Sequence, residues 1–315
     1  MNVDLSFLNA KLALPVDYKT VQFWLVGAGG TGSFMAMNLA RLAFELYQRG
    51  KAASIVIVDP DFVETDNIPR SNFCFAEIGL NKAETLAGRV SGAWGIEVGF
   101  VKEAFTPALL LTRRDDWTVQ SSSQKLTILV GCVDNHLARR EIHRCLKEFE
   151  PYNPQDAPVA WWIDGGNGKF SGQVLLGSTV KKDWVENHFT TAAICRKLPA
   201  PSLLHPELLE NQEHALRRTA APAAAAMSQR ISCPELVRLG EQSLNVNARV
   251  ALEIGEMLTQ FLLTNSLKRF GNYFDLESGT SRSLYCTPEI LEKALKEAAD
   301  NQPKTRKAKG KASGK

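Results

Sequence analysis

The sequence lacks the cysteine spacing and the long apolar runs that mark two common classes of protein. It contains 6 cysteines among 315 residues but no CxxC pair, so a structural zinc site built from two such pairs is not expected. Its apolar runs are short, and none approaches the roughly 20 residues that a membrane-spanning helix needs. The chain also does not begin with a basic segment followed by an apolar core. We therefore expect a cytoplasmic protein with no membrane partner and no disulfide bonds.

A strong charge of one sign is also missing. The formal net charge is +3 at pH 7, and the basic excess lies in residues 303–315, which include lysine and arginine but no acid. The rest of the chain is slightly acidic, which argues against a nucleic-acid partner for the fold. Residues 301–315 are expected to form a disordered, solubilising basic tail.

What the sequence does contain is a repeated alternation of strand and helix patterns. A buried strand at residues 21–27, apolar residues at helical spacing over 33–47 and a β-branched strand at 54–58 make a βαβ unit. Further strands are predicted at residues 96–101, 125–131, 159–163 and 172–176, helices at 81–90, 135–149 and 235–264, and a glycine-rich turn at Gly165, Gly166 and Gly168. The alternation predicts an α/β fold, Rossmann-like and doubly wound, with a mostly parallel sheet. A hairpin at residues 273–276 and 283–285 would add a C-terminal antiparallel extension.

A cluster of glycines follows the first strand of this pattern and opens the first helix. Gly27, Gly29, Gly30 and Gly32 allow a sharp turn and a close approach of phosphate to the backbone. The helix N-terminus adds free N–H groups and a positive partial charge. These features predict a nucleotide phosphate site, against the alternative of a simple tight turn. The motif alone does not separate NAD, FAD and ATP.

The residues behind the second strand favour a triphosphate. Asp59 ends that strand, where an acid can accept hydrogen bonds from ribose hydroxyls or cap the following loop. Asp61, Asn67, Arg70 and Lys82 follow it. Arg70 can bind phosphate oxygens through two N–H groups, and Lys82 can act as a point charge. A dehydrogenase needs no such pair of cations behind its ribose acid, although each residue alone could be a solvated surface group.

A further acid follows the strand at residues 125–131. Asp134 lies in the segment Gly-Cys-Val-Asp-Asn at residues 131–135, at the carboxyl end of the strand, where ligands bind in such sheets. A carboxylate there can hold Mg²⁺, which bridges phosphates. The alternative is that Asp134 caps the helix starting near Asn135, and the two roles are compatible.

These motifs together resemble the ThiF, MoeB and HesA family, the adenylating domain shared with ubiquitin-activating enzymes. The resemblance extends well over residues 20–175, and its pattern is most similar to the ThiF-type protein of plasmid-borne PRTRC gene systems. It is carried by the ordered segments at residues 27–32, 58–63, 67–70, 78–83, 131–135 and 165–174. Ser71 stands where the family usually has glutamine. Several relatives also place an N-terminal arginine in the partner subunit's site, whereas this chain has no arginine before Arg41.

The resemblance implies a function and a role for each motif. Asp59 would bind the ATP ribose, with Asp61 beside it, and Asn67, Arg70 and Lys82 would hold the phosphates. Asp134 would position Mg²⁺. The substrate would be the C-terminal carboxylate of a small ubiquitin-like or sulfur-carrier protein ending in glycine, which attacks the α-phosphate. The family also implies a homodimer.

The chain is expected to divide into five segments. An N-terminal segment at residues 1–20 precedes a nucleotide-binding adenylation core at 21–180. Prolines and an alanine-rich stretch make residues 181–232 irregular, and we expect a crossover loop or lid there. Residues 233–300 would complete the same domain with a helix and a hairpin. Residues 301–315 are the basic tail.

Cys233 is a separate candidate because it lies just before the helix expected from residue 235. In some relatives a cysteine at this position takes over the activated carboxyl group, and a helix N-terminus can lower a thiol pKa as that role requires. The alternative is a buried cysteine without chemical function.

Two other functions remain open from the sequence. An NAD- or FAD-dependent oxidoreductase could use the same glycine turn, but no acid–base pair for hydride transfer is evident. A non-catalytic scaffold could bind nucleotide in order to hold a partner. We expect the adenylyltransferase.

Overall fold

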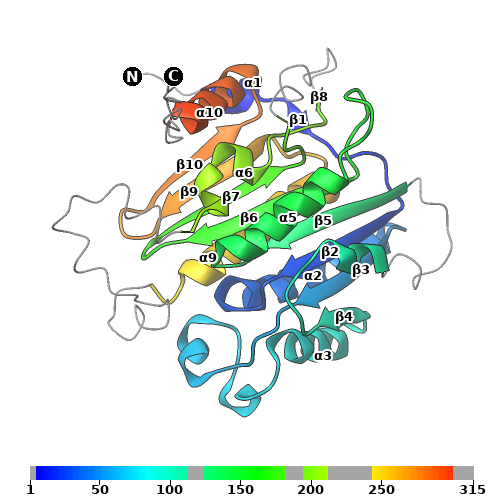
Figure 1. Ribbon diagram of the computed structural model, residues 1–315, viewed down its shortest axis with the longest axis vertical. Coiled ribbons are helices and arrows are strands. Elements are labelled where there is room, and N and C mark those ends of the chain that lie inside the picture. The colour runs from blue at the N-terminus through cyan, green and yellow to red at the C-terminus, as the bar shows by residue number, and fades with distance from the viewer. Residues whose placement is uncertain (1–4, 113–123, 182–193, 212–242, 301–315) are drawn as a thin grey trace, which may run out of the picture.

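The computed structural model describes residues 5–112, 124–181, 194–211 and 243–300. At its centre is an 8-stranded sheet in the order β10-β9-β7-β6-β5-β2-β3-β4 (Figure 1). The strands of this sheet are β2 Thr20–Val26, β3 Ala52–Val58, β4 Val98–Val101, β5 Lys125–Gly131, β6 Ala160–Asn167, β7 Ser171–Gly177, β9 Arg269–Asp275 and β10 Thr280–Tyr285. A separate parallel pair joins β1 Leu12–Ala13 to β8 Ile194–Cys195.

The strands from β4 to β6 run parallel and reverse their order beside β2. From β2 the chain moves outward to β3 and β4 on one side, and it then returns to place β5 and β6 on the other side. Residues of β2 and β5 are buried almost throughout, as expected for parallel strands that are covered on both faces. The carboxyl ends of β2 and β5 therefore lie beside each other at a topological switch point, where open α/β sheets bind ligands.

Helices cover both faces of the sheet. In Figure 1, α5 lies in front of the sheet and α2 and α9 lie behind it, where α2 packs against α9 and α3. The helices are α1 Ser6–Asn9, α2 Gly30–Gln48, α3 Lys82–Trp94, α4 Ala108–Thr112, α5 His136–Glu148, α6 Pro201–Leu204, α9 Val246–Leu262 and α10 Pro288–Asp300, with 3-10 turns η1 Thr65–Arg70, η2 Phe75–Glu77 and η5 Pro206–Leu209. The α/β fold, mostly parallel with an antiparallel C-terminal extension, is confirmed.

The glycine-rich turn predicted after residue 163 is placed differently in the structure. β6 continues through Gly165 and Gly166, which pair with Val174 and Gln173 of antiparallel β7. The chain turns after Asn167 instead. A Cβ at Gly165 would lie 2.7 Å from a methyl group of Val250 on α9, so the glycine admits the helix and does not bend the strand.

The remaining predictions beyond residue 180 fall only partly on described residues. The long helix expected at 235–264 is described as α9, Val246–Leu262, and α10 was not predicted. Between residues 181 and 232 the structure describes residue 181 and 194–211, which contain β8, α6 and η5. The expected lid and the 301–315 tail otherwise lie outside the described residues. No helix within the described ranges is both long and apolar enough to cross a membrane.

The packing of α9 on the sheet can be tested at one aromatic pair. Phe261 of α9 and Trp161 of β6 are fully buried, with ring centroids 4.7 Å apart. Phe261→Ala should lower the free energy of unfolding by about 3–5 kcal/mol, because it removes buried area and leaves a cavity. Leu252→Ala, on the same helix but 57% exposed, should change it by less than about 0.5 kcal/mol. Urea unfolding of both variants measures this, and equal effects would contradict the packing.

Candidate functional site

A cavity of about 640 Å³ opens at the carboxyl ends of β2, β3, β5 and β6, at the switch point. Its volume is within the range of small-molecule sites, about 300–1,000 Å³. The glycine turn, the loop after β3, the start of α5 and the end of β6 all contribute to its walls. Among its lining residues are Gly27, Gly29, Gly30, Asp59, Asp61, Asn67, Arg70, Lys82, Asp134, Arg140, Asn167 and Asn247. One cavity thus brings together the predicted site residues except Gly32 and Cys233.

The glycine turn forms one wall of the cavity. Gly27 has a φ of +90° that favours glycine, and a Cβ there would lie 2.5 Å from the carbonyl oxygen of Cys132. Gly29 is the N-cap of α2, and within the described residues no side chain caps this helix. The first N–H groups of α2 are therefore available to an anion. Gly32 does not line the cavity, because it packs on the turn, where a Cβ would overlap the carbonyl oxygen of Gly27.

Asp59 joins the glycine turn to the loop after β3. Its buried carboxylate accepts hydrogen bonds from the backbone N–H of Ala28 at 2.6 Å and from that of Asp61 at 2.8 Å. Burial raises the pKa of Asp59, and these two hydrogen bonds and the charge of Lys82 oppose that rise. Asp59 caps the following loop and also lines the cavity, so its role toward a ribose stays a prediction.

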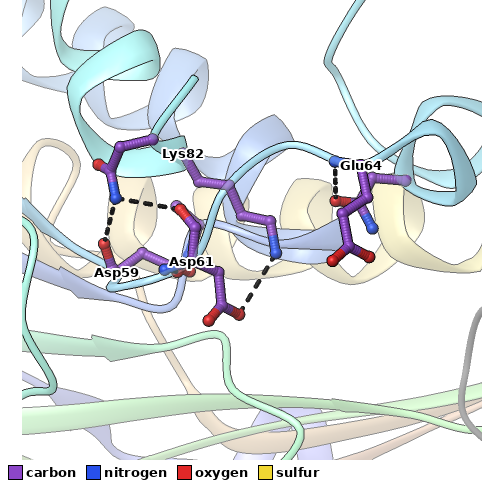
Figure 2. A network of polar contacts seen from close by, with 7 residues as sticks. Asp59, Asp61, Glu64 and Lys82 are labelled. Carbon is purple, nitrogen blue, oxygen red and sulfur yellow. Dashed lines mark hydrogen bonds and ion pairs between the residues drawn. The ribbon is translucent and has the colours of Figure 1, made fainter. Parts of the chain in front are cut away.

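Lys82 reaches the cavity from the first turn of α3. Its Nζ lies 3.4 Å from Oδ2 of Asp61, and the lysine side chain is 11% exposed (Figure 2). Asn81, the N-cap of α3, accepts a hydrogen bond from the Glu84 N–H and donates to the carbonyl oxygens of Asp59 and Asp61. The start of α3 is therefore fixed against the end of β3, and the ammonium group of Lys82 is held at the cavity beside a carboxylate.

Arg70 and Asn67 come from the 3-10 turn η1. Asn67 is buried and its Oδ1 accepts the N–H of Glu64 at 3.0 Å, which fixes the turn. The Nε of Arg70 is buried without a hydrogen-bond partner among the described residues, and Arg70 lines the cavity. A buried donor left unpaired is costly, and more so on a charged group. The guanidinium charge at the cavity wall would attract an anionic ligand.

Asp134 lies on the opposite wall, between β5 and α5, and it is exposed. The alternative that Asp134 caps α5 is wrong, because the N-cap is Asn135, whose Oδ1 accepts the N–H of Ala138 at 2.9 Å. Across the described ranges no three His, Cys, Asp or Glu residues gather as a metal cluster. Mg²⁺, however, is commonly bound by one or two carboxylates plus substrate phosphates, and a single carboxylate at a phosphate site fits that pattern.

A buried ion pair that the sequence did not reveal lies behind the Asp134 loop. Arg139 of α5 donates from Nε to both carboxylate oxygens of Asp164 in β6, at 3.2 Å each. Asp164 pairs with Gly131 in register, and a Cβ at Gly131 would lie 2.7 Å from its Oδ1. Burial raises the pKa of Asp164, whereas Arg139 opposes the rise. The pair fixes α5 against the sheet, and no spacing in the sequence connects its members.

One predicted residue cannot be placed relative to the cavity. Cys233 and the start of the helix expected after it lie outside the described residues.

Two further residues bear on the site. Ser71, at the position where the sequence departs from the family pattern, donates its hydroxyl to the carbonyl oxygen of Asn67 at 2.6 Å and so stabilises η1. Asn247 of α9, which the sequence did not single out, also lines the cavity.

Comparison with known proteins gives a family and a fold. The sequence profile of the ThiF family matches residues 12–225. A crystal structure of PaaA aligns over 85% of this chain and 64% of its own, with a TM-score of 0.51 and 14% identity. E. coli MccB with MccA aligns over 90% of this chain and 66% of its own, also with a TM-score of 0.51 and 14% identity. The chain therefore spans just under two thirds of each of these proteins, and at this identity the likeness concerns the fold. No curated protein sequence matches. Because the family profile matches well over half of the chain, the protein belongs to the ThiF family.

Proposed function

We propose that the protein is an ATP-dependent adenylyltransferase that activates a carboxyl group. The observation that carries the proposal is that Arg70, Lys82, Asp134 and the uncapped start of α2 line one cavity. These groups bring two cations, the N–H groups of a helix start and a carboxylate together. A polyphosphate is the nucleotide feature that needs this arrangement.

The proposed reaction is the transfer of an adenylyl group from ATP to a carboxylate. A carboxylate oxygen of the substrate attacks the α-phosphorus of ATP and forms an acyl-adenylate, while the bond to the β-phosphate oxygen breaks and pyrophosphate leaves. The attacking carboxylate is already ionised, so no general base is required. The start of α2, Arg70 and Lys82, which line the cavity, would bind and orient the phosphates, and Asp59 would bind the ribose. Mg²⁺ held at Asp134 would neutralise phosphate charge.

We further propose that the carboxylate belongs to a small ubiquitin-like or sulfur-carrier protein that ends in glycine. Membership of the ThiF family supports a carboxyl substrate. The structural neighbour MccB was crystallised with MccA, which is compatible with a small protein or peptide as partner. Cys233 is proposed to accept the activated carboxyl group: its thiolate would attack the carbonyl carbon of the acyl-adenylate, form a thioester and release AMP. A homodimer and the PRTRC subgroup stay predictions.

The two alternative functions differ from this one in what the cavity should bind. An oxidoreductase would bind NAD or FAD and would not need the ammonium group of Lys82. A scaffold would bind ATP but release no pyrophosphate with any partner. Arg70 and Lys82, the two cations discussed above, favour a triphosphate ligand in the cavity over a dinucleotide.

Arg70 should determine affinity for the phosphates and leave affinity for the nucleoside unchanged. Arg70→Ala should raise the Kd for ATP about 10- to 100-fold, since a hydrogen bond to a charged group contributes about 1.5–3 kcal/mol. The Kd for adenosine should change little. Calorimetric titration measures both. Lys102→Ala is the control, because Lys102 pairs with Glu84 at the surface and does not line the cavity. An equal loss for ATP and adenosine would contradict the assignment.

Pyrophosphate exchange should depend on a carboxyl-bearing partner and on Asp134. With a panel of ubiquitin-like and sulfur-carrier proteins ending in glycine, the wild type should exchange labelled pyrophosphate into ATP. Asp134→Asn should slow exchange about 100- to 1,000-fold, as expected when an electrostatic group of the transition state is removed.

Cys233→Ser should retain exchange, because adenylation precedes any transfer to the thiol. Exchange retained in both Asp134→Asn and Arg70→Ala would show that the assigned site is wrong. ATP binding without exchange across the whole panel would favour the scaffold.

A further inference from the structure

Asn247, near the N-terminus of α9, is a buried amide that makes hydrogen bonds to several parts of the cavity wall. It is 1% exposed. Its Oδ1 accepts a hydrogen bond from the hydroxyl of Thr31 at 3.1 Å and another from Nδ2 of Asn167. Its Nδ2 donates to the carbonyl oxygen of Arg70 at 2.9 Å. One side chain therefore connects α2, the end of β6 and Arg70, the last residue of η1.

Only a side chain that both donates and accepts can make this set of bonds. The amide presents an acceptor oxygen to two donors and an N–H to a carbonyl oxygen. A carboxylate could keep the bonds to Thr31 and Asn167, but it would face the carbonyl oxygen of Arg70 with a second acceptor. An apolar side chain would remove all three hydrogen bonds, including the one to the buried Thr31.

Gly30 shows how closely the amide approaches the glycine turn. A Cβ at Gly30 would overlap the side-chain nitrogen of Asn247. Glycine at this position therefore serves packing as well as the approach of a phosphate, because the absence of a side chain leaves room for the Asn247 amide beside the first residue of α2. The start of α2 and the backbone of Arg70 are thus set relative to each other through Asn247.

We propose that Asn247 is a positioning residue for phosphate binding: it fixes the N-terminus of α2 and Arg70 in the mutual arrangement that a polyphosphate requires. The inference rests on the proposed function, because it concerns the same nucleotide. It predicts that a change of the amide weakens ATP binding more than adenosine binding, while the protein remains folded.

Asn247→Asp tests this with a pH-dependent readout. At pH 8 the Kd for ATP should rise about 10-fold or more relative to wild type, while the Kd for adenosine changes less than about two-fold. Burial raises the pKa of a carboxyl group, so the new acid should protonate as the pH falls toward about 5. The protonated acid regains a donor for the carbonyl oxygen of Arg70. The ratio of variant to wild-type Kd should therefore decrease with falling pH.

Asn38→Asp is the matched control. Asn38 of α2 donates from Nδ2 to the carbonyl oxygen of Ala251 at 3.0 Å, across the same contact between α2 and α9, and it does not line the cavity. Asn38→Asp should lower the melting temperature without changing the Kd for ATP. Asn247→Ala, which adds no buried charge, provides a second variant if Asn247→Asp does not fold. It should show the same phosphate-selective loss without recovery at low pH.

The possible outcomes separate the inference from the function on which it rests. Wild-type protein that does not bind ATP would overturn the proposed function. If the wild type binds ATP, normal ATP affinity in Asn247→Ala would overturn the positioning role, because a loss in Asn247→Asp alone would come from the added charge. The same would follow if Asn38→Asp weakened ATP binding as much as Asn247→Asp, because the effect would then be that of a loosened contact between the helices.

Discussion

The site depends on the hydrogen bonds of one buried carboxylate, that of Asp59. They connect the backbone of the glycine turn after β2 to the backbone of the loop after β3. Parallel pairing brings these two chain ends to the same edge of the sheet, where the N–H of Gly27 also donates to the carbonyl oxygen of Val58. The Asp59 carboxylate extends this link to Ala28 and Asp61, and its burial makes loss of either bond costly. The loop that holds Asp61, and through it Lys82, is thereby kept at the cavity.

The charges of the cavity are partly paired within the protein. Lys82 lies beside Asp61, so a phosphate must share or take over an ammonium group that already has a carboxylate neighbour. The Nε of Arg70 has no such partner among the residues described. On the proposed function, a bound phosphate would interact with the charge of Arg70 as well as with that of Lys82. On the proposed function, Asp134 would hold a cation that the phosphates themselves help to bind, although Arg140 also lines the cavity.

The sequence predicted the features that are local and missed those that are long-range. Strand–helix alternation and the glycine turn are short-range patterns, and they gave the parallel sheet and one wall of the site. Asn247 was missed because its partner Thr31 is 216 residues away in the chain, and a helical asparagine gives no local signal. The course of β6 through Gly165 was misjudged for the same reason, because α9 is what requires a glycine there. α10 was overlooked although its apolar residues have helical spacing.

The most direct test of the account is a crystal structure with a non-hydrolysable ATP analogue. The account predicts the triphosphate over the start of α2, in contact with the backbone N–H groups there. It also predicts a phosphate oxygen within hydrogen-bonding distance of the Arg70 guanidinium and the ribose beside Asp59. A nucleotide bound elsewhere, or one whose phosphates face away from Arg70 and Lys82, would contradict it.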